Sequence, residues 1–160
     1  MKKSPKVRIA PRMPSPTEIL PGAAQQVQAL YGNAAKSGVP AATLALVHLR
    51  ISQINGCGQC IDGGAKEARH SGETDERLFA VSAWREAPYF TAAERAALDL
   101  AECSTRLSDR SEAVPDEVWK EAARHYGRKE LAGLVLAIAV VNLFNRLSVP
   151  TRQVSGEQKW

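Results

Sequence analysis

Apolar residues recur along the chain three or four positions apart, which is the spacing of a helix with one buried face. In residues 40–54 this stripe consists of Leu44, Val47, Ile51 and Ile54. Prolines and glycines separate one periodic segment from the next. No segment alternates as a strand would. The expected fold class is therefore all-α, a compact multi-helix bundle whose helices span residues 21–36, 40–54, 57–72, 75–87, 92–107, 116–127 and 129–148.

Capping signals support several of these helix starts. Thr91 and Glu94 form a capping-box pattern, and Thr74 precedes an acidic first turn. The last helix is apolar on most sides and is expected to stop before Pro150. A helix of that composition belongs at the centre of a bundle or in a subunit interface.

Proline and charge divide the chain into three parts. Residues 1–17 hold four prolines and five basic side chains but no acidic one. We expect a disordered basic arm at 1–17, one helical domain at 18–150, and a polar tail at 151–160. The five basic residues are among 21 in the chain, so 16 basic side chains face 17 acidic ones elsewhere. The folded part is near neutral, and no nucleic-acid partner is expected.

The lengths of the apolar stretches indicate the cellular location of the protein. No apolar stretch of the length found in secretory signals follows the basic arm. The longest apolar run, Leu134–Val141, is much shorter than the roughly 18 residues of a membrane span. We therefore expect a cytoplasmic protein with no membrane partner.

The stretch "NGCGQCIDGG" is the main candidate for chemistry. Cys57 and Cys60 follow the helix-breaking pair Asn55–Gly56 and should lie in the first turn of the next helix. Spacing of three residues brings two sulfurs onto one helix face. A helix N-terminus also lowers the pKa of a thiol, and only the thiolate is a nucleophile. This arrangement is typical of a redox dithiol in the cytosol.

The CxxC motif has two other interpretations. A structural zinc site needs a second ligand pair, but Cys103, His70 and His125 repeat no ligand spacing. The two cysteines could also be incidental core residues. Cys103 itself is best interpreted as a small buried apolar residue, and both histidines as cations in the last turn of a helix. We expect no metal and no cofactor.

The stretch from Leu46 to Glu102, beginning "LVHLRISQINGCGQCIDGG", resembles the AhpD-like alkylhydroperoxidase group of the carboxymuconolactone decarboxylase family. The segment "LAIAVVNLFNRLSVPTR" resembles the C-terminal helix of that group. The resemblance implies an all-α fold, a homotrimer or homohexamer, and peroxiredoxin activity. By the same resemblance, Cys60 is the peroxidatic cysteine that attacks the O–O bond. Cys57 protonates the leaving group and then closes the disulfide, which a dithiol reductant reopens.

The chain departs from the family pattern at two positions. The family has a Glu where this chain has Ala45, and a His where it has Gly64. Together these side chains relay the proton of the peroxidatic thiol, a role typically worth roughly two to four decades in rate. His48 lies one helical turn from Ala45, on nearly the same face. His48 is therefore a candidate substitute base, although it could equally lie at the edge of the buried stripe.

Three functions remain open from the sequence. The first is a thiol-dependent peroxidase, weakened by the missing relay, that takes a hydroperoxide substrate and a protein dithiol or small-thiol reductant. The second is a redox sensor or dithiol-exchange protein without efficient turnover. The third is an oligomeric scaffold or small-molecule binder that retains the fold without the chemistry. Lactone decarboxylation, which names the wider family, has no use for a CxxC motif.

Overall fold

A computed structural model describes residues 7–156 of the chain. Over these residues the protein forms eight α-helices, one short 3-10 helix and no strand, so the predicted all-α fold class is confirmed. The elements are α1 (Pro16–Ile19), α2 (Ala23–Ala35), α3 (Ala41–Asn55), α4 (Gly58–His70), α5 (Asp75–Ala80), η1 (Val81–Ala83), α6 (Ala92–Thr105), α7 (Asp116–His125) and α8 (Arg128–Thr151).

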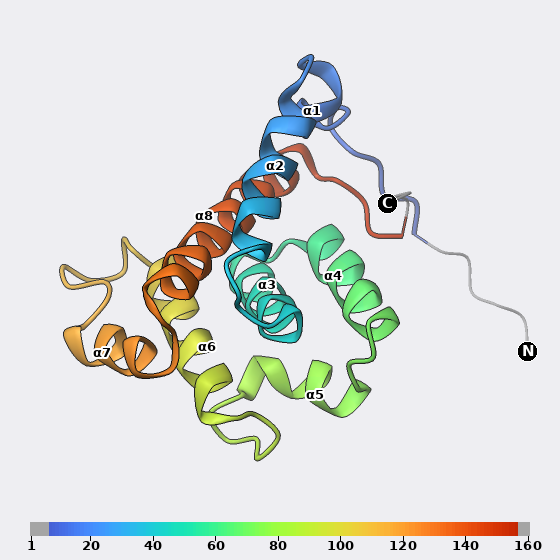
Figure 1. Cartoon of the computed structure of the whole chain (residues 1–160). Helices are drawn as coiled ribbons and strands as arrows, with labels where there is room; N and C mark the ends of the chain where they lie inside the picture. Colours follow the sequence, from blue (N-terminus) through green and yellow to red (C-terminus); the bar gives the residue numbers. More distant parts are fainter. Residues whose placement is uncertain (1–6, 157–160) are drawn as a thin grey trace, which may run out of the picture.

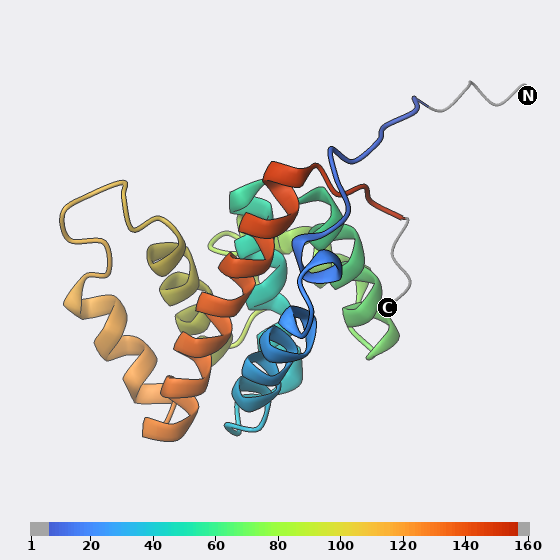
Figure 2. The ribbon, with the colours of Figure 1, turned by 90° about the horizontal axis from the view of Figure 1, so that it is seen from above.

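The helix α3 lies at the centre of the bundle, with α4, α6 and α8 packed around it (Figure 1). The helix α2 runs alongside α8 (Figure 2). Among the described residues, α8 alone is long and apolar enough to cross a membrane by length and composition. In this structure it packs against α2, α3 and α6.

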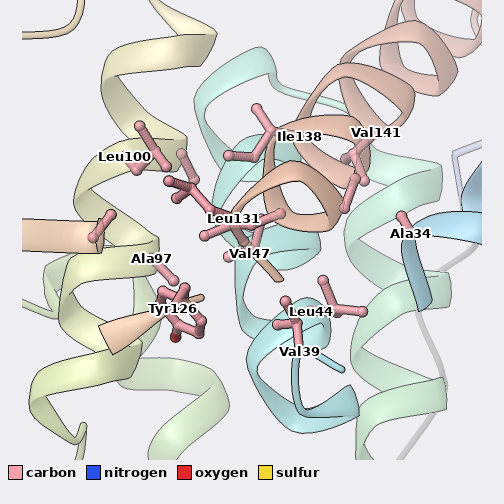
Figure 3. Close-up of a cluster of buried hydrophobic side chains, with 14 of the residues drawn as sticks. Ala34, Val39, Leu44, Val47, Ala97, Leu100, Tyr126, Leu131, Ile138 and Val141 are labelled. Atoms are coloured by element: carbon pink, nitrogen blue, oxygen red, sulfur yellow. The ribbon is translucent and has the colours of Figure 1, made fainter. Parts of the chain in front are cut away.

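Two apolar clusters meet at α3. The larger one joins α3 to α6 and α8 and contains Leu44, Val47, Leu100 and Ile138 (Figure 3). The smaller one lies on another face of α3 and includes Leu46, Leu49, Leu78, Trp84 and Phe90. A helix buried on two faces cannot shift against either cluster, so α3 is a fixed platform for whatever its ends carry.

The helix α8 approaches the end of α2 closely because residue 133 is glycine. A Cβ atom at Gly133 would lie 2.1 Å from the Cβ and Oγ of Ser37 and 3.1 Å from the carbonyl oxygen of Ala34. No real side chain tolerates the first of these distances. Gly133 therefore sets the depth at which α8 enters the bundle.

The beginning of the chain differs from the prediction in its helix boundaries. The arm was expected to be irregular through residue 17, but α1 begins at Pro16, which suits the first position of a helix. The next helix begins at Ala23 rather than residue 21, because Gly22 adopts a left-handed conformation with φ of 80°. The first part of the expected disordered arm, residues 1–6, lies outside the described residues, as do residues 157–160 of the expected tail.

The helix predicted over residues 75–87 is shorter than expected. Regular α-helix ends at Ala80 and tightens into η1, which ends at Ala83. Beyond it, the carbonyl oxygens of Trp84, Arg85 and Ala87 accept hydrogen bonds from the Arg95 guanidinium, and that of Trp84 also accepts from the Ala87 amide at 3.3 Å. A side chain of α6 thus holds the segment that follows η1, where the sequence predicted further helix.

The last helix is longer than expected and contains Pro150 in its final turn. The N-terminal arm supplies donors to the carbonyl groups left free at that end. The Arg12 guanidinium donates to the carbonyl oxygen of Pro150 at 2.8 Å, and the Arg12 amide donates to that of Thr151 at 2.8 Å. The end of α8 is therefore capped by a segment that is about 140 residues distant in the sequence.

Candidate functional site

The C-terminal turn of α3 fixes where the CxxC motif begins. Gly56 is left-handed with φ of 66°, and its amide donates to the carbonyl oxygen of Gln53 at 3.3 Å. The next amide, that of Cys57, donates to the carbonyl oxygen of Ser52 at 3.0 Å. These two bonds form a Schellman motif, which ends one helix and redirects the chain at once. The glycine at position 56 is what makes the turn accessible to the backbone.

Cys57 occupies the N-cap position of α4, and Cys60 lies in the first turn. The Cys57 sulfur accepts a hydrogen bond from the Cys60 amide at 3.3 Å. The two cysteines form a disulfide, with their Cα atoms 5.3 Å apart. The predicted position of the CxxC motif at a helix N-terminus is therefore confirmed. Both residues are buried, with 2% of Cys57 and 6% of Cys60 exposed.

The His48 ring of α3 lies directly against Gly64 of α4. A Cβ atom at Gly64 would be 3.3 Å from Cδ2 and Nε2 of His48 and 3.6 Å from Cε1. Such contacts are tight enough that the ring would have to shift. The absence of a side chain at Gly64 therefore makes the space that the His48 imidazole fills, one helical turn beyond Cys60.

The His48 side chain is largely enclosed. Burial lowers its pKa from 6.5 to about 4, and the backbone of Cys60, which acts to raise the pKa, offsets only part of that effect. Its Nε2 atom is buried and has no hydrogen-bond partner within the described part of the chain. At neutral pH the imidazole is therefore uncharged, and it can still accept a proton.

Ala45 offers no titratable group at the other relay position. It is partly buried and packs with Ile61 against the smaller apolar cluster. The structure thus brings His48, Gly64 and Cys60 together at the α3–α4 contact and leaves a methyl group at residue 45.

A buried polar network lies behind the dithiol and was not anticipated from the sequence. The Asn55 amide donates to Oδ1 of Asn145 at 2.8 Å and to Oδ1 of Asn142 at 3.0 Å. Asn145 in turn donates to Oγ of Ser52 at 3.2 Å, and Asn142 donates to Oγ1 of Thr105 at 3.1 Å. The sequence signal for this network was the pair of asparagines within an otherwise apolar helix.

The segment before α1 contacts the segment after α8, which passes beside the start of α4. The Gln153 amide donates to the carbonyl oxygen of Met13 at 2.9 Å. A Cβ atom at Gly58, the residue after Cys57, would lie 3.1 Å from Oγ of Ser155. The segment after α8 therefore runs close to the first turn of α4 (Figure 1).

The remaining candidates lie apart from the dithiol. Cys103 is a free, buried cysteine of α6, as expected, and its sulfur accepts from the Arg110 guanidinium at 3.3 Å. Burial is the main cause that raises the pKa of this thiol. His70 and His125 each lie in the last turn of a helix, as predicted. Within residues 7–156, no three His, Cys, Asp or Glu side chains come together in a way that could hold a metal ion.

A surface groove of the bundle also lies elsewhere. It has a volume of about 470 Å³ and is lined from α6 and α7, by Asp99, Glu117, Val118, Lys120, Glu121 and Arg124. None of the dithiol residues borders it. Its lining is charged and open, and it has no nucleophile.

Comparison with known proteins agrees with this architecture. The carboxymuconolactone decarboxylase family model matches residues 21–102. The uncharacterized protein YdfG of Bacillus subtilis is 38% identical over 114 residues, which cover 71% of this chain and 76% of YdfG. The uncharacterized protein YnjA of Escherichia coli is 34% identical over 104 residues, covering 64% of this chain but only 55% of YnjA.

A solved structure matches nearly the whole chain. It is a protein of unknown function from Agrobacterium tumefaciens, described as a candidate AhpD antioxidant defence protein. The two superpose with a TM-score of 0.85 and 31% sequence identity, covering 93% of this chain and 100% of that one. The family match, the relatives and the helix-capping CxxC agree with one another. The chain therefore belongs to the carboxymuconolactone decarboxylase family, in its AhpD-like group.

Proposed function

We propose that this protein is a thiol-dependent peroxidase, which reduces hydroperoxides with Cys57 and Cys60 at a rate limited by its altered proton relay. One observation carries the proposal. The two sulfurs lie in the first turn of α4 within bonding distance of each other, and Cys57 accepts the hydrogen bond of the Cys60 amide. The partial positive charge of the helix N-terminus favours the thiolate of Cys60 in the first turn, and the Cys60 amide favours the thiolate that Cys57 becomes once it has protonated the leaving group.

The catalytic cycle transfers two electrons from the reductant to the peroxide. The Cys60 thiolate attacks one peroxide oxygen, the O–O bond breaks, and the leaving alkoxide takes a proton from Cys57 to become an alcohol. Cys60 is then a sulfenic acid. The Cys57 thiolate attacks that sulfur, the disulfide forms, and hydroxide leaves and is protonated to water. A dithiol reductant then returns two electrons and two protons by thiol–disulfide exchange.

His48 is the group we propose as the base for the Cys60 thiol. Its ring fills the space left by Gly64, one turn beyond Cys60, and it is neutral at physiological pH. A base with a pKa of about 4 takes a proton from a thiol with an ordinary pKa of about 8.5 only uphill. We therefore expect His48 to assist the reaction weakly, and the enzyme to be slower than one with a well-matched base.

The test is peroxide turnover by the reduced protein. Mixing it with cumene hydroperoxide should consume two thiols per chain, and dihydrolipoamide should then sustain turnover. Replacing Cys60 with Ser should abolish turnover, because the attacking sulfur is gone. Replacing Cys103 with Ser is the matched control, since Cys103 lies on α6 away from the disulfide, and this variant should retain full activity. Turnover that survives in Cys60→Ser would overturn the proposal.

A redox sensor or dithiol-exchange protein is the second candidate. It is favoured by the low exposure of both cysteines, 2% and 6%, which limits the approach of a large reductant. A sensor would consume peroxide once per disulfide and then stop, even with excess dihydrolipoamide. Continued turnover distinguishes the enzyme from the sensor. A scaffold without redox chemistry would instead leave both thiols unreacted.

We further propose that the protein works in the cytoplasm as a homotrimer or homohexamer, with a protein dithiol or small thiol as its reductant. Apolar side chains left partly exposed on the outer face of α8, namely Val135, Leu143 and Val149, favour contact with another subunit. Light scattering of the purified protein measures the oligomeric state. A single species of monomer mass would contradict this part of the proposal.

A further inference from the structure

Asn145 is a buried amide in a helix that is otherwise mostly apolar where it faces the core. Its side chain is 1% exposed. An unpaired buried amide is destabilising, so its partners decide whether it is tolerated. Both ends of the amide are paired: Oδ1 accepts from Asn55 at 2.8 Å, and Nδ2 donates to Ser52 at 3.2 Å.

These two partners flank the turn that seats Cys57. The carbonyl oxygen of Ser52 accepts the Cys57 amide, and Asn55 immediately precedes the left-handed Gly56. One side chain of α8 therefore holds both ends of the last turn of α3. The same turn sets the position of the Cys57 sulfur, which accepts the Cys60 amide only while Cys57 remains at the N-cap of α4.

We propose that Asn145 is a positioning residue for the dithiol. It fixes the Ser52–Asn55 turn to α8 and thereby keeps the Cys57 sulfur at the N-terminus of α4. Without it, the end of α3 can fray, and the Cys57 thiolate loses its stabilising amide. The inference rests on the dithiol centre of the proposed function, but it concerns the state of Cys57 and requires no peroxide.

The experiment titrates one thiol. In a Cys60→Ser, Cys103→Ser background Cys57 is the remaining cysteine, and the ultraviolet absorbance of its thiolate gives a pH midpoint without any reagent needing access. Asn145→Ala should raise this midpoint by roughly one pH unit, which is the size expected from losing one charge-assisted hydrogen bond at a helix N-terminus. The thiolate fraction at neutral pH would fall up to about tenfold.

A second, milder variant keeps the test valid if Asn145→Ala does not fold. Ser52→Ala removes only the hydroxyl that accepts from Asn145, and it should shift the midpoint in the same direction. Thr105→Val is its matched control, because it removes a hydroxyl that accepts from the neighbouring Asn142 but lies on α6. Thr105→Val should lower stability and leave the midpoint unchanged.

The outcomes separate this inference from the proposed function. An activated Cys57 in the background protein, with no shift in either Ser52→Ala or Asn145→Ala, overturns the role of Asn145 alone. Equal shifts in Ser52→Ala and Thr105→Val overturn it as well, because the effect would be general loosening. A background midpoint near the ordinary value of about 8.5 overturns both the inference and the activated dithiol. An activated dithiol that does not reduce peroxide overturns only the proposed function.

Discussion

The middle of α3 packs through Leu44, Val47 and Ile51 into the larger apolar cluster, whereas its last turn packs through Ser52 and Asn55 against asparagines of α8. The apolar contacts are non-directional, and each buried side chain contributes roughly 1.5–3 kcal/mol in proportion to its area. The polar contacts each contribute less, but they have fixed directions and leave an unpaired group when broken. The first region therefore supplies stability, and the second supplies the geometry that the dithiol needs.

The largest expected effect is on stability and falls on the apolar region. Leu134→Ala, at a fully buried position of α8, should lower the free energy of unfolding by about 2–5 kcal/mol. Urea denaturation measures that loss. The titration of Cys57 in the folded variant should be unchanged, because Asn145 lies eleven residues along α8 from Leu134. A shifted thiol titration in Leu134→Ala would show that the two regions are not separable.

The next effect is an acid-dependent loss of stability that comes from His48. Its pKa is lowered to about 4 in the folded protein, whereas the unfolded chain has the ordinary value of 6.5. Between these two values the unfolded state binds more protons, so stability is greatest above pH 6.5 and falls as the pH drops toward 4. The expected total is on the order of 3 kcal/mol.

Unfolding midpoints in urea at several pH values between 4 and 7 measure this slope, and His48→Leu should flatten it. His70→Gln, which changes an exposed histidine at the end of α4, is the control and should retain the slope. The Glu102 carboxylate affects stability only at lower pH. Burial raises the pKa of Glu102, but hydrogen bonds from Arg85, Trp84 and Arg50 outweigh this and lower it below 4.5. An unchanged slope in His48→Leu would assign the effect to another group.

The apolar region was the part of the fold most accessible from the sequence. The periodicity of Leu44, Val47 and Ile51 predicted the buried face of α3, because apolar residues three or four positions apart lie on the same face of a helix. Helix ends were less accessible where a distant side chain intervenes. Arg95 binds the carbonyl groups of the segment after η1, and Arg12 caps the end of α8 beyond Pro150. Neither contact leaves a local signal.

The candidate site was predictable in its cysteines and not in its surroundings. The position of Cys57 follows from local turn chemistry, because Gly56 ends α3 and the next residue, Cys57, is the N-cap of α4. Asn145 and Ser52 are 93 positions apart in the sequence, so no local pattern predicts that they pair. The approach of His48 to Gly64 likewise depends on how α3 and α4 cross. Sequence suggested His48 as a candidate, and the space that receives its ring became visible only in three dimensions.

The smallest expected effect is on the reaction rate, and it comes from one methyl group added at Gly64 that should not lower stability. Gly64→Ala adds a methyl group 3.3 Å from the His48 ring, which must shift by a few tenths of an ångström. Alanine also improves helix propensity by up to about 1 kcal/mol, so the variant should be at least as stable as the parent. The rate of peroxide-dependent disulfide formation should nevertheless fall roughly two- to fivefold, because a proton acceptor is moved. Gly32→Ala in α2, where a Cβ meets nothing within 4 Å, should gain similar stability and keep the full rate. Equal rates in the two variants would mean that His48 takes no part in the reaction, and that the helix terminus alone activates the dithiol.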